Sequence, residues 1–132
     1  MKKDLLTEPN NAAHVSAGML CPLGEIIHAS NHVVELGMRS LKRWPTILSD
    51  LNALDPEHQS VFFEQRGSLA VSFTQDQSCF AQLQQDLAHK AVDQQAYIEH
   101  LNRKQLHELE PALAKFNQGM FLTTEGQLCN RS

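Results

Sequence analysis

Apolar residues between Ser30 and Leu54 recur at spacings of three, four and seven positions, which is the pattern of an amphipathic helix. The pattern is carried by Val34, Met38, Leu41, Leu48 and Leu51, and Val33, Leu36 and Trp44 widen the apolar face. Ser30 is a favourable N-cap residue. Pro45 lies inside the segment, so we expect it to kink or split the helix.

Residues 61–73 have the composition of two strands that meet near Gly67. The alternation is clearest in the second strand, at Leu69, Val71 and Phe73. Thr74 and Gln77 have the spacing of a capping box, which predicts that a helix begins there. That helix has one apolar stripe, formed by Phe80, Leu83 and Leu87.

The last third of the sequence predicts a short helix and a strand. Asn102 and Gln105 have the spacing of a second capping box, and Pro111 limits the helix that they open. Residues 119–123 read as a strand, and residues 124–126 as the turn that ends it. Helices and strands in this arrangement predict an α+β fold.

Residues 16–25 combine small residues with closely spaced Gly and Pro, which predicts an irregular loop. Ala17 and Gly18 leave the backbone bare enough for a flat or charged ligand to lie against it. Taken alone, the pattern favours a plain connecting loop over a ligand-binding loop.

Residues 4–9 are a short apolar run that ends in Glu8 and Pro9. The run is either a frayed terminus or a buried strand whose Glu8 presents an acceptor. In dinucleotide-binding folds such an acid binds the ribose, and a Gly-rich turn precedes it by about 20 residues. Only seven residues precede Glu8, and no G-x-G-x-x-G occurs in the sequence.

Composition and net charge exclude some classes of protein function. The 132 residues are enough for one domain, and 42% hydrophobic with 20% charged residues is typical of a globular protein. A net charge of -4 without a basic stripe argues against nucleic-acid binding. No apolar run is long enough for a membrane span, and no signal-peptide core follows Met1. Three cysteines without CxxC spacing suggest thiols in a reducing compartment, so we expect a cytoplasmic protein.

Several segments match one family in the same order. They are Leu-Leu-Thr-Glu-Pro at 5–9, Ser-Ala-Gly-Met-Leu-Cys-Pro at 16–22, Ser-Leu-Lys-Arg-Trp-Pro at 40–45, Arg-Gly-Ser-Leu at 66–69, the helix closing on Glu-Pro at 106–113, and residues 119–130. Together they resemble the FAD-dependent D-amino-acid oxidase family, in its glycine oxidase branch, which includes the glycine oxidase of thiamine biosynthesis. The segment at 16–22 is similar to the family's Ala-Ala-Gly-Met-Leu-Ala-Pro loop, which passes against the flavin.

The resemblance implies a domain division and a set of FAD contacts. It makes residues 1–25 a remnant of the FAD-binding domain and residues 26–132 part of the substrate domain. It places Glu8 on the ribose of FAD, and Ser16, Ala17, Gly18 and Met19 in the loop beside the flavin. The chemistry of this family belongs to the flavin, so no catalytic side chain is assigned.

The sequence also departs from the family. His14, Val15 and Ser16 stand where the family prefers smaller residues, and Cys21 replaces an alanine. The family's Gly-rich phosphate turn and its substrate-carboxylate arginine have no counterpart among the 132 residues. We therefore expect an incomplete chain that is inactive alone and binds FAD only if a Gly-rich unit is supplied.

Two functions follow from these observations. The first is part of an FAD-dependent oxidoreductase that converts a small amino acid to an imine with release of hydrogen peroxide. The second is a non-catalytic remnant or interaction module of the same fold without cofactor. Unpaired strand edges and apolar helix faces lead us to expect self-association or a complementing chain. His28 and His32 are four residues apart, but no third ligand lies at a suitable distance, so we expect no metal site.

Overall fold

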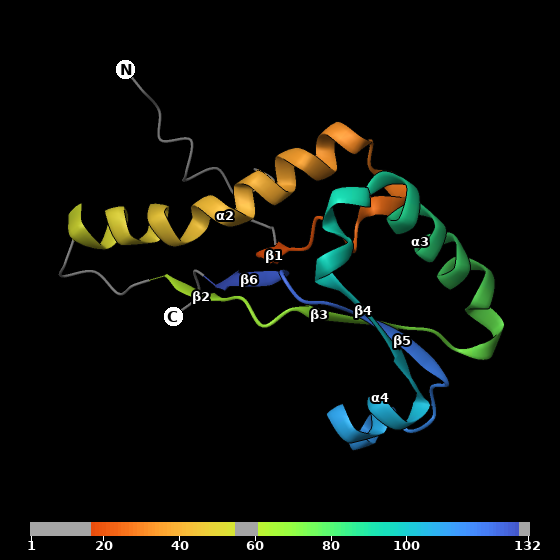
Figure 1. The fold of residues 1–132 in the computed structure, drawn as a ribbon. Coiled ribbons are helices and arrows are strands. Elements are labelled where there is room, and N and C mark those ends of the chain that lie inside the picture. Colours follow the sequence, from red (N-terminus) through yellow and green to blue (C-terminus); the bar gives the residue numbers. More distant parts are fainter. Residues whose placement is uncertain (1–16, 55–60, 130–132) are drawn as a thin grey trace.

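The computed structural model describes residues 17–54 and 61–129, which form two small antiparallel sheets with helices packed against them (Figure 1). The strands are β1 (Met19–Leu20), β2 (Phe62–Glu64), β3 (Ser68–Val71), β4 (Ile98–Asn102), β5 (Gln118–Leu122) and β6 (Gly126–Cys129). The α-helices are α2 (Asn31–Leu54), α3 (Gln77–Lys90) and α4 (Arg103–Leu109). Short 3-10 helices occupy Ile26–His28, Thr74–Asp76, Val92–Tyr97 and Pro111–Leu113. Mixed helix and sheet confirms the predicted α+β class.

The two sheets are linked by chain segments that pass from one to the other. One sheet has the strand order β1-β6-β2 and the other β3-β5-β4. Residues 65–67 lead from β2 into β3, and residues 123–125 lead from β5 into β6. Gly67, between β2 and β3, has a φ of 81°, a conformation that glycine adopts without strain. The predicted division of residues 61–73 near Gly67 is confirmed.

The hydrophobic core lies between α2, α3, the 3-10 helix at 26–28 and strand β5. Along β5, Gly119, Met120 and Leu122 are buried and Phe121 is half-buried, so most of this strand lies inside the fold. The predicted stripe of α3 is buried in full, at Phe80, Leu83 and Leu87. In Figure 1, α2 and α3 lie on one side of the sheets, whereas α4 lies at the far end of β4 and β5.

Helix α2 begins directly after Ser30 and continues through Pro45 as one element, so Pro45 does not split the helix. It buries Val34, Met38 and Leu41, together with Leu48. None of the helices in the described ranges combines the length and hydropathy needed to cross a membrane.

The two predicted capping boxes differ in outcome. At α4 the box is present, because the Asn102 side chain accepts from the Gln105 backbone and the Gln105 side chain accepts from the Asn102 backbone. At Thr74 the prediction is wrong: residues 74–76 form a 3-10 turn, α3 begins at Gln77, and neither start has a side-chain cap. A capping box requires this spacing of residues, but the spacing alone does not determine where a helix begins.

Candidate functional site

Strand β1 carries the loop singled out in the sequence, and it is held by pairing with the far end of the chain. Met19 lies opposite Gln127 and Leu20 opposite Gly126 in β6. The backbone N–H of Leu128 also donates to the Gly18 carbonyl over 2.7 Å. Residues more than one hundred positions apart in the sequence therefore fix the loop.

Gly18 is required by this pairing. Its φ is 72°, and a Cβ added to it would lie 2.0 Å from the carbonyl oxygen of Leu128. Both the backbone conformation and the contact exclude a larger residue. The bare backbone at Gly18 thus serves close packing against β6, and a ligand is not needed to explain the glycine.

The loop after β1 is anchored by the carboxylate of Glu125, which is completely buried. Its Oε1 accepts the backbone N–H of Leu23 at 3.0 Å and that of Gly24 at 2.6 Å, and its Oε2 accepts the hydroxyl of Ser68. The backbone of Glu125 accepts the N–H of Gly67 as well. One side chain therefore ties the 20–25 loop to the point where β2 becomes β3 and β5 becomes β6.

Glu125 and burial also set the chemistry of Cys21. Burial raises the pKa of the Cys21 thiol to about 11, and the negative charges of Glu125 and Glu25 act in the same direction. A thiol of this kind stays protonated at neutral pH. Cys21 is therefore a packing residue and a poor nucleophile.

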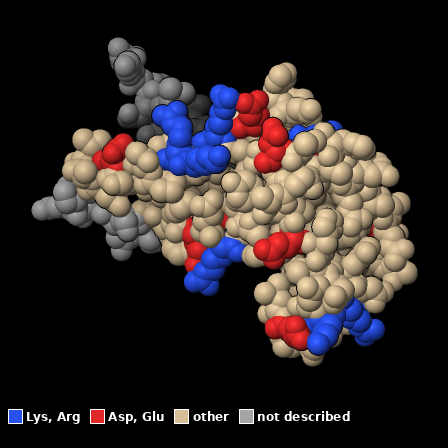
Figure 2. All heavy atoms as spheres, in the orientation of Figure 1, with Lys and Arg blue, Asp and Glu red and all other residues tan. Residues whose placement is uncertain are grey.

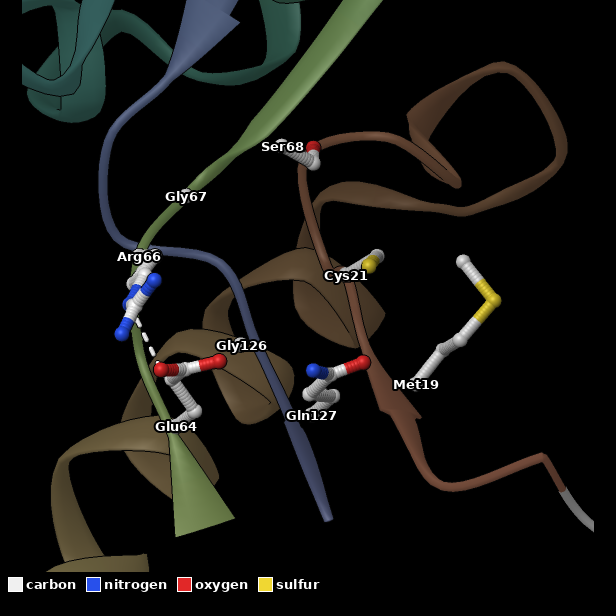
Figure 3. A pocket seen from close by; sticks show the side chains of 8 residues that line it. All are labelled: Met19, Cys21, Glu64, Arg66, Gly67, Ser68, Gly126 and Gln127. Carbon is white, nitrogen blue, oxygen red and sulfur yellow. Dashed lines mark ion pairs between the residues drawn. The ribbon is translucent and has the colours of Figure 1, made fainter. Parts of the chain in front are cut away.

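A small pocket of about 190 Å³ opens beside the loop (Figure 3). It is lined by Met19, Cys21, Glu64, Arg66, Gly67, Ser68, Gly126 and Gln127. Met19, Gln127 and Glu64 lie opposite one another on β1, β6 and β2, so their side chains share one face of the sheet. Glu64 forms an ion pair with Arg66 at 2.5 Å, drawn as a dashed line in Figure 3.

The volume of the pocket is below that of a typical small-molecule site. The pocket could therefore accept only the edge of a flat ring. Its charged groups neutralise each other, and its thiol is protonated. No group of three or more His, Cys, Asp or Glu that could hold a metal occurs in residues 17–54 and 61–129. The arrangement can position a ligand, but it offers no acid–base pair.

The predicted cofactor residues are only partly within the described chain. Glu8 and Ser16 lie outside it, so their predicted roles stay predictions. Ala17 is exposed, Gly18 is packed on β6, and Met19 is 67% exposed beside the pocket. Gly18 immediately precedes the short strand β1, of which Met19 is the first residue.

The residues that sequence reasoning missed are Glu125 and Ser68, together with strands β4 and β6. Residues 124–126 were recognised as a turn, but a charged residue in a turn is expected to be solvated. An acid next to Gly between two strands carries no local sign of burial, so the burial of Glu125 is visible only in the tertiary structure.

The sequence matches the family model described as FAD dependent oxidoreductase over residues 6–132. The chain belongs to this family. No curated protein matches the sequence significantly.

Among solved structures, the chain is similar to glycine oxidase from Geobacillus kaustophilus, with a TM-score of 0.71 and 18% sequence identity. The match covers 90% of this chain and 31% of that one. At this identity the likeness shows a shared fold. The chain spans about a third of the length of the protein it matches, and the predicted resemblance to the glycine oxidase fold is confirmed.

Proposed function

We propose that this chain forms the flavin-side part of an FAD-dependent amino-acid oxidoreductase that resembles glycine oxidase. The observation that carries the proposal is the loop after β1. The chain belongs to an FAD-dependent family. The Glu125 carboxylate holds this loop by two backbone hydrogen bonds, and Met19 lies beside the pocket. Ser16, Ala17, Gly18 and Met19 would lie along the flavin, and Glu8 would bind the ribose.

FAD, held by Ala17, Gly18 and Met19 with Glu8 at its ribose, would supply the redox chemistry that oxidises a small amino acid to an imine, with oxygen as the electron acceptor and hydrogen peroxide as the by-product. The residues of this chain would position the flavin and shield it. Glu125 fixes the loop, Met19 offers an apolar contact, and Cys21 remains neutral beside it.

A non-catalytic module of the same fold is the second candidate. It is favoured by the volume of the pocket, about 190 Å³, which is below that of a typical small-molecule site.

Flavin retention distinguishes the two candidates. We expect the purified chain, mixed with FAD and desalted, to be colourless and to produce no peroxide with glycine or sarcosine. Fusion to the flanking parts of a glycine oxidase should restore yellow, desalting-resistant flavin absorbance. A folded fusion that stays colourless would contradict the oxidoreductase proposal, and flavin bound by the chain alone would contradict the need for added segments.

Within the fusion, the site residues have an expected order. Gly18→Val should abolish flavin retention, Glu8→Ala should weaken it, and His28→Ala should leave it unchanged. Because Gly18→Val also disturbs β6, Met19→Ala is the cleaner probe of contact with the flavin. Leu109→Ala is its control, since Leu109 is similarly exposed on α4. Equal retention by the Met19 and Leu109 variants would remove the β1 loop from the cofactor site.

A further inference from the structure

The wall of the pocket beside β1 is backed by a buried carboxylate. Two residues that line the pocket in Figure 3, Cys21 and Ser68, also hydrogen-bond to the side chain of Glu125. Gly126, the residue after Glu125, lines the pocket as well. Glu125 is completely buried and is not part of the lining. Its carboxylate therefore lies one hydrogen bond behind the surface that the pocket presents.

The contacts of this carboxylate are those of an ionised group. It accepts the N–H groups of Leu23 and Gly24 and the hydroxyl of Ser68. The thiol of Cys21 is a fourth donor. Four donors fill the acceptor capacity of a carboxylate, which has about four lone-pair sites when it is ionised. A proton on either oxygen would displace one of these hydrogen bonds, so the group carries a full negative charge.

The negative charge of Glu125 is not neutralised by its surroundings. Among residues 17–54 and 61–129, no Lys, Arg or His forms an ion pair with Glu125. Arg66 lines the same pocket, but it pairs with Glu64 and its side chain is 83% exposed. Leu23, which donates to the carboxylate, is fully buried, so little water screens the charge. The pocket and the wall behind it thus carry one uncompensated negative charge.

A buried anion at this distance acts on a flavin in the pocket through space. Reduction by two electrons and one proton adds one negative charge to a bound flavin. Two like charges repel each other more strongly inside a protein than in water, because the effective dielectric constant is lower. Glu125 should therefore disfavour the reduced flavin relative to the oxidised flavin.

We propose that Glu125 lowers the reduction potential of the flavin, acting as an uncompensated anion behind the pocket wall without touching the cofactor. This role requires a flavin beside β1, so it rests on the proposed function. It adds an electrostatic effect to the anchoring of the 20–25 loop. A flavin whose reduced form is disfavoured gives up its electrons more readily, which suits an enzyme that passes them to oxygen.

The charge at the pocket wall can be tested in the chain alone, without flavin. Burial raises the pKa of the Cys21 thiol to about 11, and the charge and hydrogen bond of Glu125 act in the same direction. Glu125→Gln removes the charge and keeps the acceptor of both backbone hydrogen bonds. At pH 9, iodoacetamide should therefore alkylate Cys21 several-fold faster in this variant, because a larger fraction of the thiol is ionised.

Two matched variants separate the charge from the packing. Ser68→Ala removes one hydrogen bond of the carboxylate but leaves its charge, and it should change the alkylation rate little. Glu99→Gln removes an exposed charge outside the pocket and should not change the rate. Mass spectrometry of the Cys21 peptide distinguishes this thiol from the other two cysteines, and circular dichroism checks that each variant is folded.

The decisive measurement is the reduction potential of the flavin retained by the fusion to the flanking parts of a glycine oxidase. A unit charge within about 12 Å, at an effective dielectric constant of about 20, changes the relative affinity for reduced and oxidised flavin about tenfold or more. For a two-electron couple, a tenfold change is about 30 mV. Glu125→Gln should therefore raise the potential by at least this amount. Ser68→Ala and Glu99→Gln should shift it by much less, as measured by equilibration with a dye of known potential.

Failure of this role and failure of the proposed function give different results. If the fusion retains flavin but Glu125→Gln shifts the potential no more than Ser68→Ala or Glu99→Gln, the electrostatic role is refuted and the proposed function stands. If Cys21 is alkylated at the same rate in Glu125→Gln and the wild type, the charge does not reach the pocket wall and the role is again refuted. A folded fusion without flavin would overturn both.

Discussion

Removal of the Glu125 carboxylate should be among the most damaging single changes to this fold. Glu125→Ala removes the acceptor of the Leu23 N–H, the Gly24 N–H and the Ser68 hydroxyl. It also removes the hydrogen-bond partner of the Cys21 thiol. Leu23 is fully buried, Ser68 is half-buried and Gly24 is exposed. Water can therefore replace the acceptor at Gly24 but not at Leu23.

The magnitude follows from these environments. Each donor left unsatisfied away from water costs about 1–3 kcal/mol, so Leu23 and Ser68 together account for about 2–6 kcal/mol of the free energy of unfolding. The loss is a large part of the ~5–15 kcal/mol that stabilises a typical domain. The desolvation of a buried carboxylate is relieved in the variant, which places the expected value toward the lower end of this range.

Glu125→Gln should cost much less, for an atomic reason. Both backbone N–H groups donate to Oε1, which the glutamine retains. Its Nε2 replaces Oε2 and can donate to the Ser68 hydroxyl, which then acts as acceptor. We expect a loss of about 1 kcal/mol, the value of an ordinary hydrogen bond.

Urea unfolding followed by circular dichroism measures these differences. Glu99→Ala, at an exposed acid on β4, is the control and should change stability by less than about 0.5 kcal/mol. Hydrogen exchange at Leu23 and Gly24 reports on the loop directly and should accelerate in Glu125→Ala. If Glu125→Ala were as stable as Glu99→Ala, the anchoring role of the carboxylate would be refuted.

Three further changes test other parts of the structure by the same unfolding assay. Gly18→Ala should destabilise the fold by more than ~2 kcal/mol, because the new Cβ meets the Leu128 carbonyl in a strained φ. Gly24→Ala makes ordinary contacts and restricts the unfolded chain, so it should leave stability unchanged or raise it by up to about 1 kcal/mol. Equal effects of the two variants would contradict the contact at Gly18. The pKa of Cys21 is raised from 9.0 to about 11, so the folded state keeps the thiol proton at a higher pH than the unfolded state does. The free energy of unfolding should therefore decrease as the pH rises from 9.0 to about 11. Cys21→Ala should make this decrease smaller. Asn102→Ala removes the cap of α4 and should cost about 1 kcal/mol, and no measurable change would argue against the capping box.

The sequence alone determined the elements whose signal is local. Helix α3 buries the apolar residues that recur with helical spacing in its sequence. Helix α4 begins at the capping box that the spacing of Asn102 and Gln105 predicts. The break at Gly67 was readable because a glycine between two alternating runs marks a change of direction. The family was readable as well, since motifs in a fixed order survive at an identity too low for general similarity.

Only the tertiary structure decided which elements meet. Strand β1 has two residues and no pattern of its own, and its partner β6 lies at the other end of the sequence. Glu125 reads as a solvated turn residue until the 20–25 loop folds over it and supplies two backbone donors. Likewise, the apolar positions of α2 form one broad face in the sequence, and the fold divides them into a buried stripe and an exposed one. The physical reason is the same in each case: periodicity reports the environment that a segment can accept, whereas burial depends on what the rest of the chain brings against it.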